Sequence, residues 1–189
     1  IEADPSFSEA HLQLALLYQD DGNNQNVEDH FNLAIVSAVD QIHKLEKRGG
    51  ELIKMFQFQN AKQKFMKAQD KRNHCAEVYY QQSIYFQNQK NTEEQLDSLK
   101  NSIKMNPSKS NYHRDLGILL SHQNHLEHAR SQLEKALDLN YADSQSHFNL
   151  GKILSQMKDY KDAEQHFLSA LDISPEFVDC MVEMANLKL

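Results

Sequence analysis

The chain has 189 residues, 40% of them hydrophobic and 25% charged, and its formal net charge is −7. It has no run approaching the roughly 18 apolar residues of a membrane span, and its two distant cysteines, Cys75 and Cys180, suggest isolated buried thiols rather than a disulfide framework or a zinc site. Only 5 glycines and 3 prolines are present, too few for the many turns of an all-β protein, so an all-α fold is expected.

An internal repeat organises the sequence. The three prolines, Pro5, Pro107 and Pro175, are 102 and 68 residues apart, and both separations are multiples of 34. Without any insertion, this period gives the units 8–41, 42–75, 76–109, 110–143 and 144–177, with partial units at 1–7 and 178–189. The whole chain, 1–189, is therefore interpreted as a single array.

Each unit predicts two helices of about 13 residues joined by a tight turn. In the second half of a unit, a mostly small residue is followed by a large one and then by another small one, as in Ala163, Phe167 and Ala170 of the fifth unit. Offsets of four and three place such residues on one stripe of a helix, and the small side chains let two helices approach closely. Turn residues at 20–23 and 158–160 lie where the first and fifth units need them.

The second unit departs from this pattern. Between Gln25 and Arg48 there is no glycine or proline, and apolar residues keep helical spacing across the boundary at residues 41 and 42. Gly49 and Gly50 then predict a break or hinge inside the first helix of this unit. Two structures stay open: a rearranged hairpin in which a helix runs on across the boundary, or a regular repeat with a kink.

The last residues, 178–189, predict an unfinished first helix with Met181 and Met184 at core spacing. Such a helix would leave an apolar face bare at the end of the array. The chain is therefore expected to be a segment of a longer array, unless this helix caps the array or packs against a second copy.

The fifth unit resembles the tetratricopeptide repeat. The residues that carry the resemblance to its pattern, W-x2-L-G-x2-Y, then A-x3-F, then P, are Leu150, Gly151, Leu154, Ala163, Phe167, Ala170 and Pro175, with His147 in the leading aromatic position. The resemblance extends over the chain from Asp4 onward. It implies an all-α, right-handed superhelical solenoid of antiparallel helix hairpins, whose concave face is lined by the first helix of each unit.

The resemblance also implies which residues bind a partner on that concave face. They are Tyr80, Ile84, Asn88, Arg114, Ile118, Phe148 and Lys152. Aromatic and arginine side chains dominate binding hot spots, so Tyr80, Arg114 and Phe148 are the expected anchors. Chaperone-binding members of the family clamp a C-terminal carboxylate with paired Lys and Asn, but the corresponding slots here hold pairs such as Tyr80 with Ile84. Terminal-carboxylate capture is therefore not expected.

Histidine and charge patterns offer two further sites. His122, His125 and His128 lie three residues apart and raise the hypothesis of a metal site, although the predicted helix ends within the run, which favours solvated turn histidines. Residues 42–75 carry nine basic and three acidic residues, a net +6 that suits either an anionic partner or a solvated face complementing the acidic first unit. The second interpretation is favoured, and no nucleic-acid module accompanies the basic residues.

The sequence shows no phosphate-binding loop and no catalytic motif, so we expect no enzymatic activity, no catalytic residues, no metal and no cofactor. The expected function is a scaffold or adaptor that binds a peptide or helix of a partner protein in its groove. The alternatives are a regulatory or targeting arm of a larger enzyme and a self-assembling scaffold, which would form homo-oligomers. No signal or membrane-spanning segment is apparent, so we expect a cytoplasmic location and no direct insertion into membranes.

Overall fold

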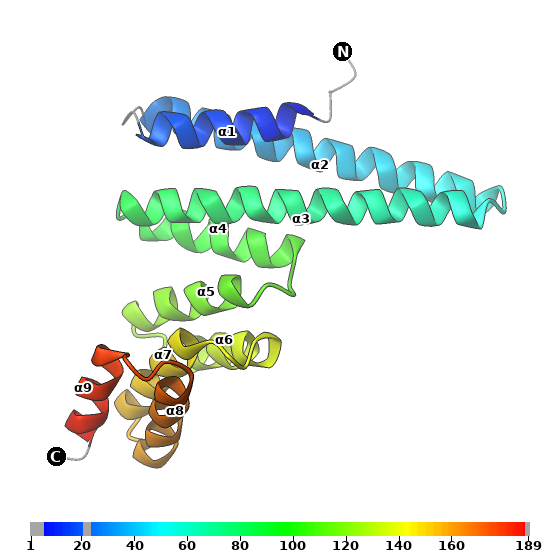
Figure 1. The fold of residues 1–189 in the computed structure, drawn as a ribbon. Helices are drawn as coiled ribbons and strands as arrows, with labels where there is room; N and C mark the ends of the chain where they lie inside the picture. The colour runs from blue at the N-terminus through cyan, green and yellow to red at the C-terminus, as the bar shows by residue number, and fades with distance from the viewer. Residues whose placement is uncertain (1–5, 21–23, 188–189) are drawn as a thin grey trace. The chain divides into compact units, whose positions relative to one another are not determined.

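The computed structural model describes residues 6–20 and 24–187, and every regular element within these ranges is an α-helix. In chain order the helices are α1 (Ser6–Asp20), α2 (Asn24–Lys54), α3 (Phe58–Asn88), α4 (Thr92–Met105), α5 (Ser110–His122), α6 (Leu126–Leu139), α7 (Ser144–Gln156), α8 (Tyr160–Ile173) and α9 (Val178–Leu187) (Figure 1). They form two compact units, residues 1–107 and 108–189. Most of the turn expected at 20–23 lies outside the described residues.

In the second compact unit, α5 to α8 make the two regular hairpins that the period predicts, with helices of 13 or 14 residues. Each hairpin turns at a residue with positive φ, which is 62° at Asn124 and 66° at Lys158. The following amide reaches back to the helix that has just ended, as His125 N donates to Leu120 O over 2.9 Å. These bonds satisfy carbonyls that a helix end otherwise leaves unpaired.

Small residues lie where the paired helices cross, as the sequence predicts. A Cβ atom built on Gly151 would lie 2.7 Å from the ring of Phe167, and one on Gly117 would lie 2.8 Å from Leu133. Ala163 is completely buried in the same core as Leu133 and Phe167. Because no other residue is as small as glycine, this close packing of α5 on α6 and of α7 on α8 depends on it.

The first compact unit contains two helices of 31 residues, α2 and α3. Helix α2 joins the expected second helix of unit 8–41 to the expected first helix of unit 42–75, and α3 joins units 42–75 and 76–109 in the same way. Neither junction, at residues 41–42 or 75–76, contains the proline that ends the helices near 107 and 175. Of the two interpretations left open, the helix that runs on across the boundary is therefore the one observed, and the kink of the regular repeat is not.

The hinge expected at Gly49 and Gly50 is wrong, because α2 continues through both residues. Gly49 occupies the same repeat position as Gly117 and Gly151, 34 and 68 residues earlier. A Cβ atom at Gly49 would lie 2.8 Å from the ring of Phe65 on α3. This glycine is therefore a crossing residue between two helices and not a break in one.

The fused helices give this unit a long antiparallel hairpin. Helix α1 packs against α2, and α4 packs against α3, while α2 and α3 pack against each other. Figure 1 shows that the joined ends of α2 and α3 extend well beyond α1 and α4. Among the described helices of this unit, only α2 and α3 themselves pack along the far part of the hairpin, so side chains on its outer faces are exposed.

Helix α9 lies at the end of the second unit and packs against α8 and α7. Cys180 is buried there, with its thiol 3.4 Å from the carbonyl oxygen of Phe167, and Met184 packs against the same core. Met181 is 46% exposed, so core spacing predicted its position wrongly.

The other cysteine, Cys75, is also buried and free, and burial raises the pKa of its thiol to about 11. Both thiols fit the expected structural role.

Candidate partner-binding surface

The residues expected to bind a partner lie on the first helices of three successive repeats. In the first compact unit, α3 carries Tyr80, Ile84 and Asn88 at intervals of four residues, which places them on one helix face. Tyr80 and Ile84 are half-buried, and Asn88 is exposed. This part of the predicted surface is accessible along two turns of α3.

In the second compact unit, α5 carries Arg114 and Ile118, and α7 carries Phe148 and Lys152 at the equivalent repeat positions. Arg114, Ile118 and Lys152 are half-buried. Phe148 differs from them, since only 7% of it is exposed. Its ring centroid lies 4.8 Å from that of Phe177, in the link between α8 and α9.

Phe148 is therefore a core residue of this unit, and its position does not support the anchoring role expected of it. A sequence position on a first helix does not reveal that the link after α8 covers the ring. The cationic group of Lys152 lies 5.4 Å from the centre of the same ring, a favourable cation–π arrangement. Of the two binding residues predicted on α7, Lys152 is therefore the accessible one.

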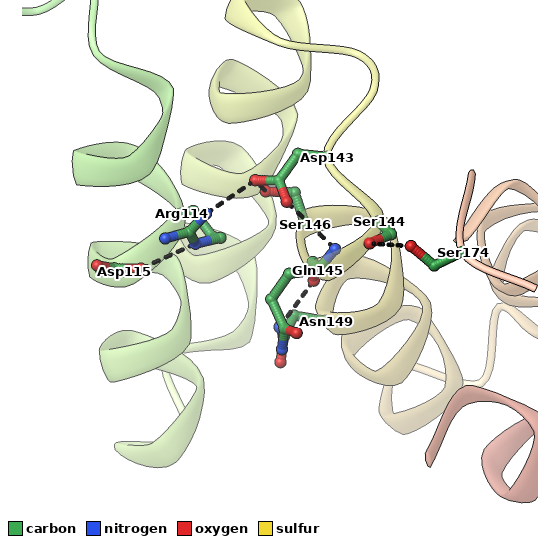
Figure 2. Close-up of polar contacts among 8 residues, drawn as sticks. All are labelled: Arg114, Asp115, Asp143, Ser144, Gln145, Ser146, Asn149 and Ser174. Carbon is green, nitrogen blue, oxygen red and sulfur yellow. Dashed lines mark hydrogen bonds and ion pairs between the residues drawn. The ribbon is translucent and has the colours of Figure 1, made fainter. Parts of the chain in front are cut away.

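Arg114 is held by two carboxylates (Figure 2). Its Nε donates to Oδ1 of Asp115 over 2.9 Å, and its Nη1 donates to Oδ2 of Asp143 over 3.2 Å. Burial lowers the pKa of Arg114, but Asp115 and then Asp143 raise it more, so the net shift is upward and the guanidinium stays charged. Two negative groups surround one positive group, so an incoming anion would be repelled as well as attracted.

Asp143 also caps the start of helix α7, so the residue that holds Arg114 also stabilises the fold. Its Oδ1 accepts from the backbone N–H of Gln145 over 3.2 Å, and its Oδ2 accepts from the hydroxyl of Ser146 over 2.8 Å. Aspartate is a preferred residue immediately before a helix because it satisfies such free N–H groups. Asp143 was not among the site residues expected from the sequence, although its place directly before a predicted helix is a signal of this kind.

A shallow depression of about 610 Å³ lies beside this start of α7. It is lined by Ser144, Gln145, Ser174, Pro175, Glu176 and Phe177. The hydroxyl of Ser174 donates to that of Ser144 over 3.0 Å, and Figure 2 shows this pair next to Gln145 and Asn149. Serine hydroxyls and a glutamine amide offer both donors and acceptors, which suits hydrogen bonding to a peptide backbone.

The histidines at the fourth position of their units pack inside the hairpins. His11, His113 and His147 are buried, and each pairs with the residue 19 positions later in the chain. In contrast, His122, His125 and His128 are exposed around the α5–α6 turn. Within residues 6–20 and 24–187, no three His, Cys, Asp or Glu side chains are grouped so that they could hold a metal ion.

Comparison with known protein families identifies one repeat directly. Residues 144–177, which span the fifth unit, match the family model described as tetratricopeptide repeat. This unit is a tetratricopeptide repeat, and its bounds coincide with those given by the 34-residue period. No curated protein matches the chain by sequence.

Solved structures show that the fold is the helical repeat fold of tetratricopeptide domains. The OM64 domain from Arabidopsis is similar, with a TM-score of 0.60 at 17% identity over 61% of this chain and 96% of that one. The first domain of Spaghetti (RPAP3), bound to the HSP90 peptide SRMEEVD, has a TM-score of 0.60 at 14% identity over 61% and 92% of the two chains. The first domain of human RPAP3 has a TM-score of 0.59 at 15% identity over 61% and 91%.

Proposed function

We propose that the chain is a non-catalytic interaction module that binds a peptide or helix of a partner protein along the exposed faces of its first helices. The observation that carries this proposal is the recurrence of accessible apolar and hydrogen-bonding side chains at the same repeat positions, Tyr80 and Ile84 on α3 and Arg114 and Ile118 on α5. The repeat fold supports it, because stacked hairpins present long surfaces suited to extended ligands. One structural neighbour is bound to a peptide.

The chemistry of this face favours a neutral or basic peptide over an acidic chain end. The cation on this face of α5 is Arg114, and the carboxylates of Asp115 and Asp143 already balance its charge. The slots that would supply paired Lys and Asn hold Tyr80 with Ile84 and Arg114 with Ile118. We therefore expect affinity to come from apolar contacts at the isoleucines and from hydrogen bonds at the start of α7.

Affinity capture from the source cell tests the proposal with two triple variants. The face variant carries Tyr80→Ala, Ile118→Ala and Lys152→Ala. The control carries Lys104→Ala, Lys135→Ala and Leu168→Ala, which alter exposed side chains on the second helices α4, α6 and α8. We expect the parent and the control to retain the same partner and the face variant to lose it, with all three equally helical by circular dichroism. Equal capture by all three would place the binding surface elsewhere.

Self-association is a second candidate function, and α9 is the observation that favours it. Val178, Met181 and Val182 on this last helix are exposed apolar residues. Burying them against a second copy would remove apolar surface from water. Light scattering over a wide concentration range tests this candidate, which requires a mass above that of one copy and a lower mass in a Val182→Asp variant.

A further inference from the structure

The far end of the α2–α3 hairpin, residues 52–69, gathers apolar side chains that no described residue of the first compact unit covers; we call this segment the hairpin tip. Its exposed members are Ile53, Met55, Phe56, Phe58, Phe65 and Met66. Phe56, in the turn itself, is 82% exposed. Figure 1 places this turn at the extreme end of the two long helices, away from α1 and α4.

The turn residue is unfavourable for the fold. The positive-φ position of the four described hairpin turns is held by Phe56, Lys90, Asn124 and Lys158, which are spaced by 34 residues. A bulky aromatic residue is strained in this left-handed conformation, whereas asparagine tolerates it well. Phe56 N donates to Ile53 O and Gln57 N to Leu52 O over 2.9 Å each, so the turn has the same bonds as its hydrophilic equivalents. The fold gains nothing from an exposed phenylalanine there.

The hairpin tip is also uniformly basic. It contains Lys54, Lys62, Lys64 and Lys67 and no Asp or Glu, although the chain as a whole has a net charge of −7. In the part of the chain that the structure describes, none of these four lysines forms an ion pair with a carboxylate. A strained, exposed aromatic turn flanked by unpaired lysines is suited to a surface that is both apolar and anionic.

We propose that the hairpin tip binds the surface of an anionic lipid membrane, with Phe56, Met55 and Phe58 entering the layer between headgroups and acyl chains. Apolar side chains of peripheral proteins reach roughly 5–10 Å into this layer. Lysines beside them are attracted by the negative surface potential of anionic lipids. The long stems of the lysines also remain in contact with apolar groups while their charges stay at the phosphates.

The shape of the tip favours a membrane over a protein segment as its occupant. A depression of about 500 Å³ on the hairpin is lined by Ile53, Phe58, Ala61, Lys62, Phe65, Met66 and Gln69. An acidic helix lying in this depression would leave Met55 and Phe56, at the apex, unused. A lipid surface contacts the apex and the sides of the hairpin tip together. The described helices include none that is long and apolar enough to cross a membrane, and binding of this peripheral kind requires none.

Vesicle sedimentation of the 189-residue chain tests the proposal. The probe is phosphatidylcholine vesicles with about 30 mol% phosphatidylserine, compared with pure phosphatidylcholine, at roughly 0.1 M and 1 M salt. Phe56→Asn gives the tip the residue found at Asn124. The control, Tyr141→Asn, removes a 70% exposed aromatic residue from another loop. We expect binding of the parent and the control to anionic vesicles only, weaker binding at high salt, and affinity about tenfold lower for Phe56→Asn.

A fluorescent reporter separates insertion from charge attraction alone. The chain has no tryptophan, so Phe56→Trp and Tyr141→Trp each introduce a single one. Emission from Trp at position 56 is expected to shift to shorter wavelength when anionic vesicles are added, and emission from position 141 is expected to stay unchanged. If the Tm of Phe56→Asn equals or exceeds that of the parent, its weaker binding to vesicles does not result from unfolding.

Three results would overturn the proposal. They are equal vesicle binding by Phe56→Asn and the parent, an unshifted emission from position 56 on bound vesicles, and no vesicle binding by the parent at either salt concentration. If the parent ignores vesicles but binds a soluble polyglutamate peptide through the same lysines, the occupant is an acidic protein segment and the membrane proposal is wrong. Peptide binding on the α3, α5 and α7 faces is measured separately, so either proposal can fail alone.

Discussion

At the scale of single residues, the positions where helices cross have the least freedom. Ala163 on α8 is completely buried in the core that α7 and α8 share. A carboxylate there would be removed from water without a partner. We expect Ala163→Asp to lower the free energy of unfolding by about 3–5 kcal/mol. Chemical denaturation measures this loss.

Gln165→Asp is the matched control for Ala163→Asp, because Gln165 is exposed on the same helix two residues away. It is expected to cost about 0.5 kcal/mol from helix propensity. Equal unfolding of Ala163→Asp and the parent would show that residue 163 is not at the crossing.

The paired histidines give the second prediction at this scale. Nδ1 of His147 lies 2.9 Å from Nδ1 of His166, so one ring must donate and the other accept, which requires at least one neutral imidazole. Burial is the main cause that lowers the pKa of both rings, and for His166 the neighbouring His147 lowers it further. The unfolded chain therefore binds more protons than the folded chain. Stability is full above about pH 6.5 and is lost as the pH falls through the lowered pKa values.

His166→Gln is expected to reduce this acid sensitivity. It reproduces the pair in which Nδ1 of His113 lies 2.8 Å from the amide oxygen of Gln132, with one imidazole instead of two. Melting curves between about pH 7.5 and pH 5 should show a fall in Tm that is smaller than that of the parent by a few degrees. An identical fall in both proteins would mean that this pair does not carry the pH dependence.

At the scale of elements, the 34-residue period predicts the helices α5 to α8 but not the fusion of helices that forms α2 and α3. The 34-residue spacing predicted α5 to α8, since turn residues separate these helices from one another and Pro107 and Pro175 lie just before and just after them. The same period did not settle whether residues 42–75 form a regular repeat. Gly49, which the sequence predicts to be a helix breaker, is instead the small residue that lets Phe65 approach. A glycine alone does not distinguish these roles, because both follow from its missing side chain.

Gly50→Ala tests the continuity of α2. No atom outside the helix lies within 4 Å of a Cβ built there, so alanine meets no obstacle. In a helix interior, alanine is more stable than glycine by about 0.5–1 kcal/mol. We therefore expect Gly50→Ala to raise Tm.

Gly151→Ala is the contrasting variant. Its Cβ would lie 2.7 Å from the buried ring of Phe167, so it is expected to lower Tm. If Gly50 were a hinge with a conformation closed to alanine, Gly50→Ala would lower Tm as well.

At the scale of the whole molecule, the buried residues divide as the helices do. The largest core cluster draws only on residues between Ala129 and Cys180, whereas two other clusters draw on residues between Leu12 and Phe86. In repeat proteins, stability is close to a sum of local terms. A lesion in one unit is therefore expected to act mainly on that unit.

Hydrogen exchange followed by mass spectrometry of Ala163→Asp measures this division. We expect amide protection to fall in α6 to α9 and to persist in α2 and α3. A uniform loss along the chain would show that the protein unfolds as one cooperative unit.

The candidate binding face was predictable only in part. The repeat positions of Tyr80, Ile84 and Ile118 follow from the period together with the family resemblance, and they are accessible in the structure. The burial of Phe148 and the pairing of Arg114 with Asp143 depend on the links after α8 and α6. Links carry little periodic signal, so their contacts cannot be derived from the spacing of apolar residues.

Site-specific photo-cross-linking in the source cell tests the central claim most directly. A photoreactive amino acid is placed singly at Asn88, at Ile118 or at Tyr160, which is exposed on the second helix α8. If the first helices form the binding surface, positions 88 and 118 will yield adducts with a common partner protein, and position 160 will yield none. Adducts from position 160 alone, or equal adducts from all three positions, would contradict the proposed function.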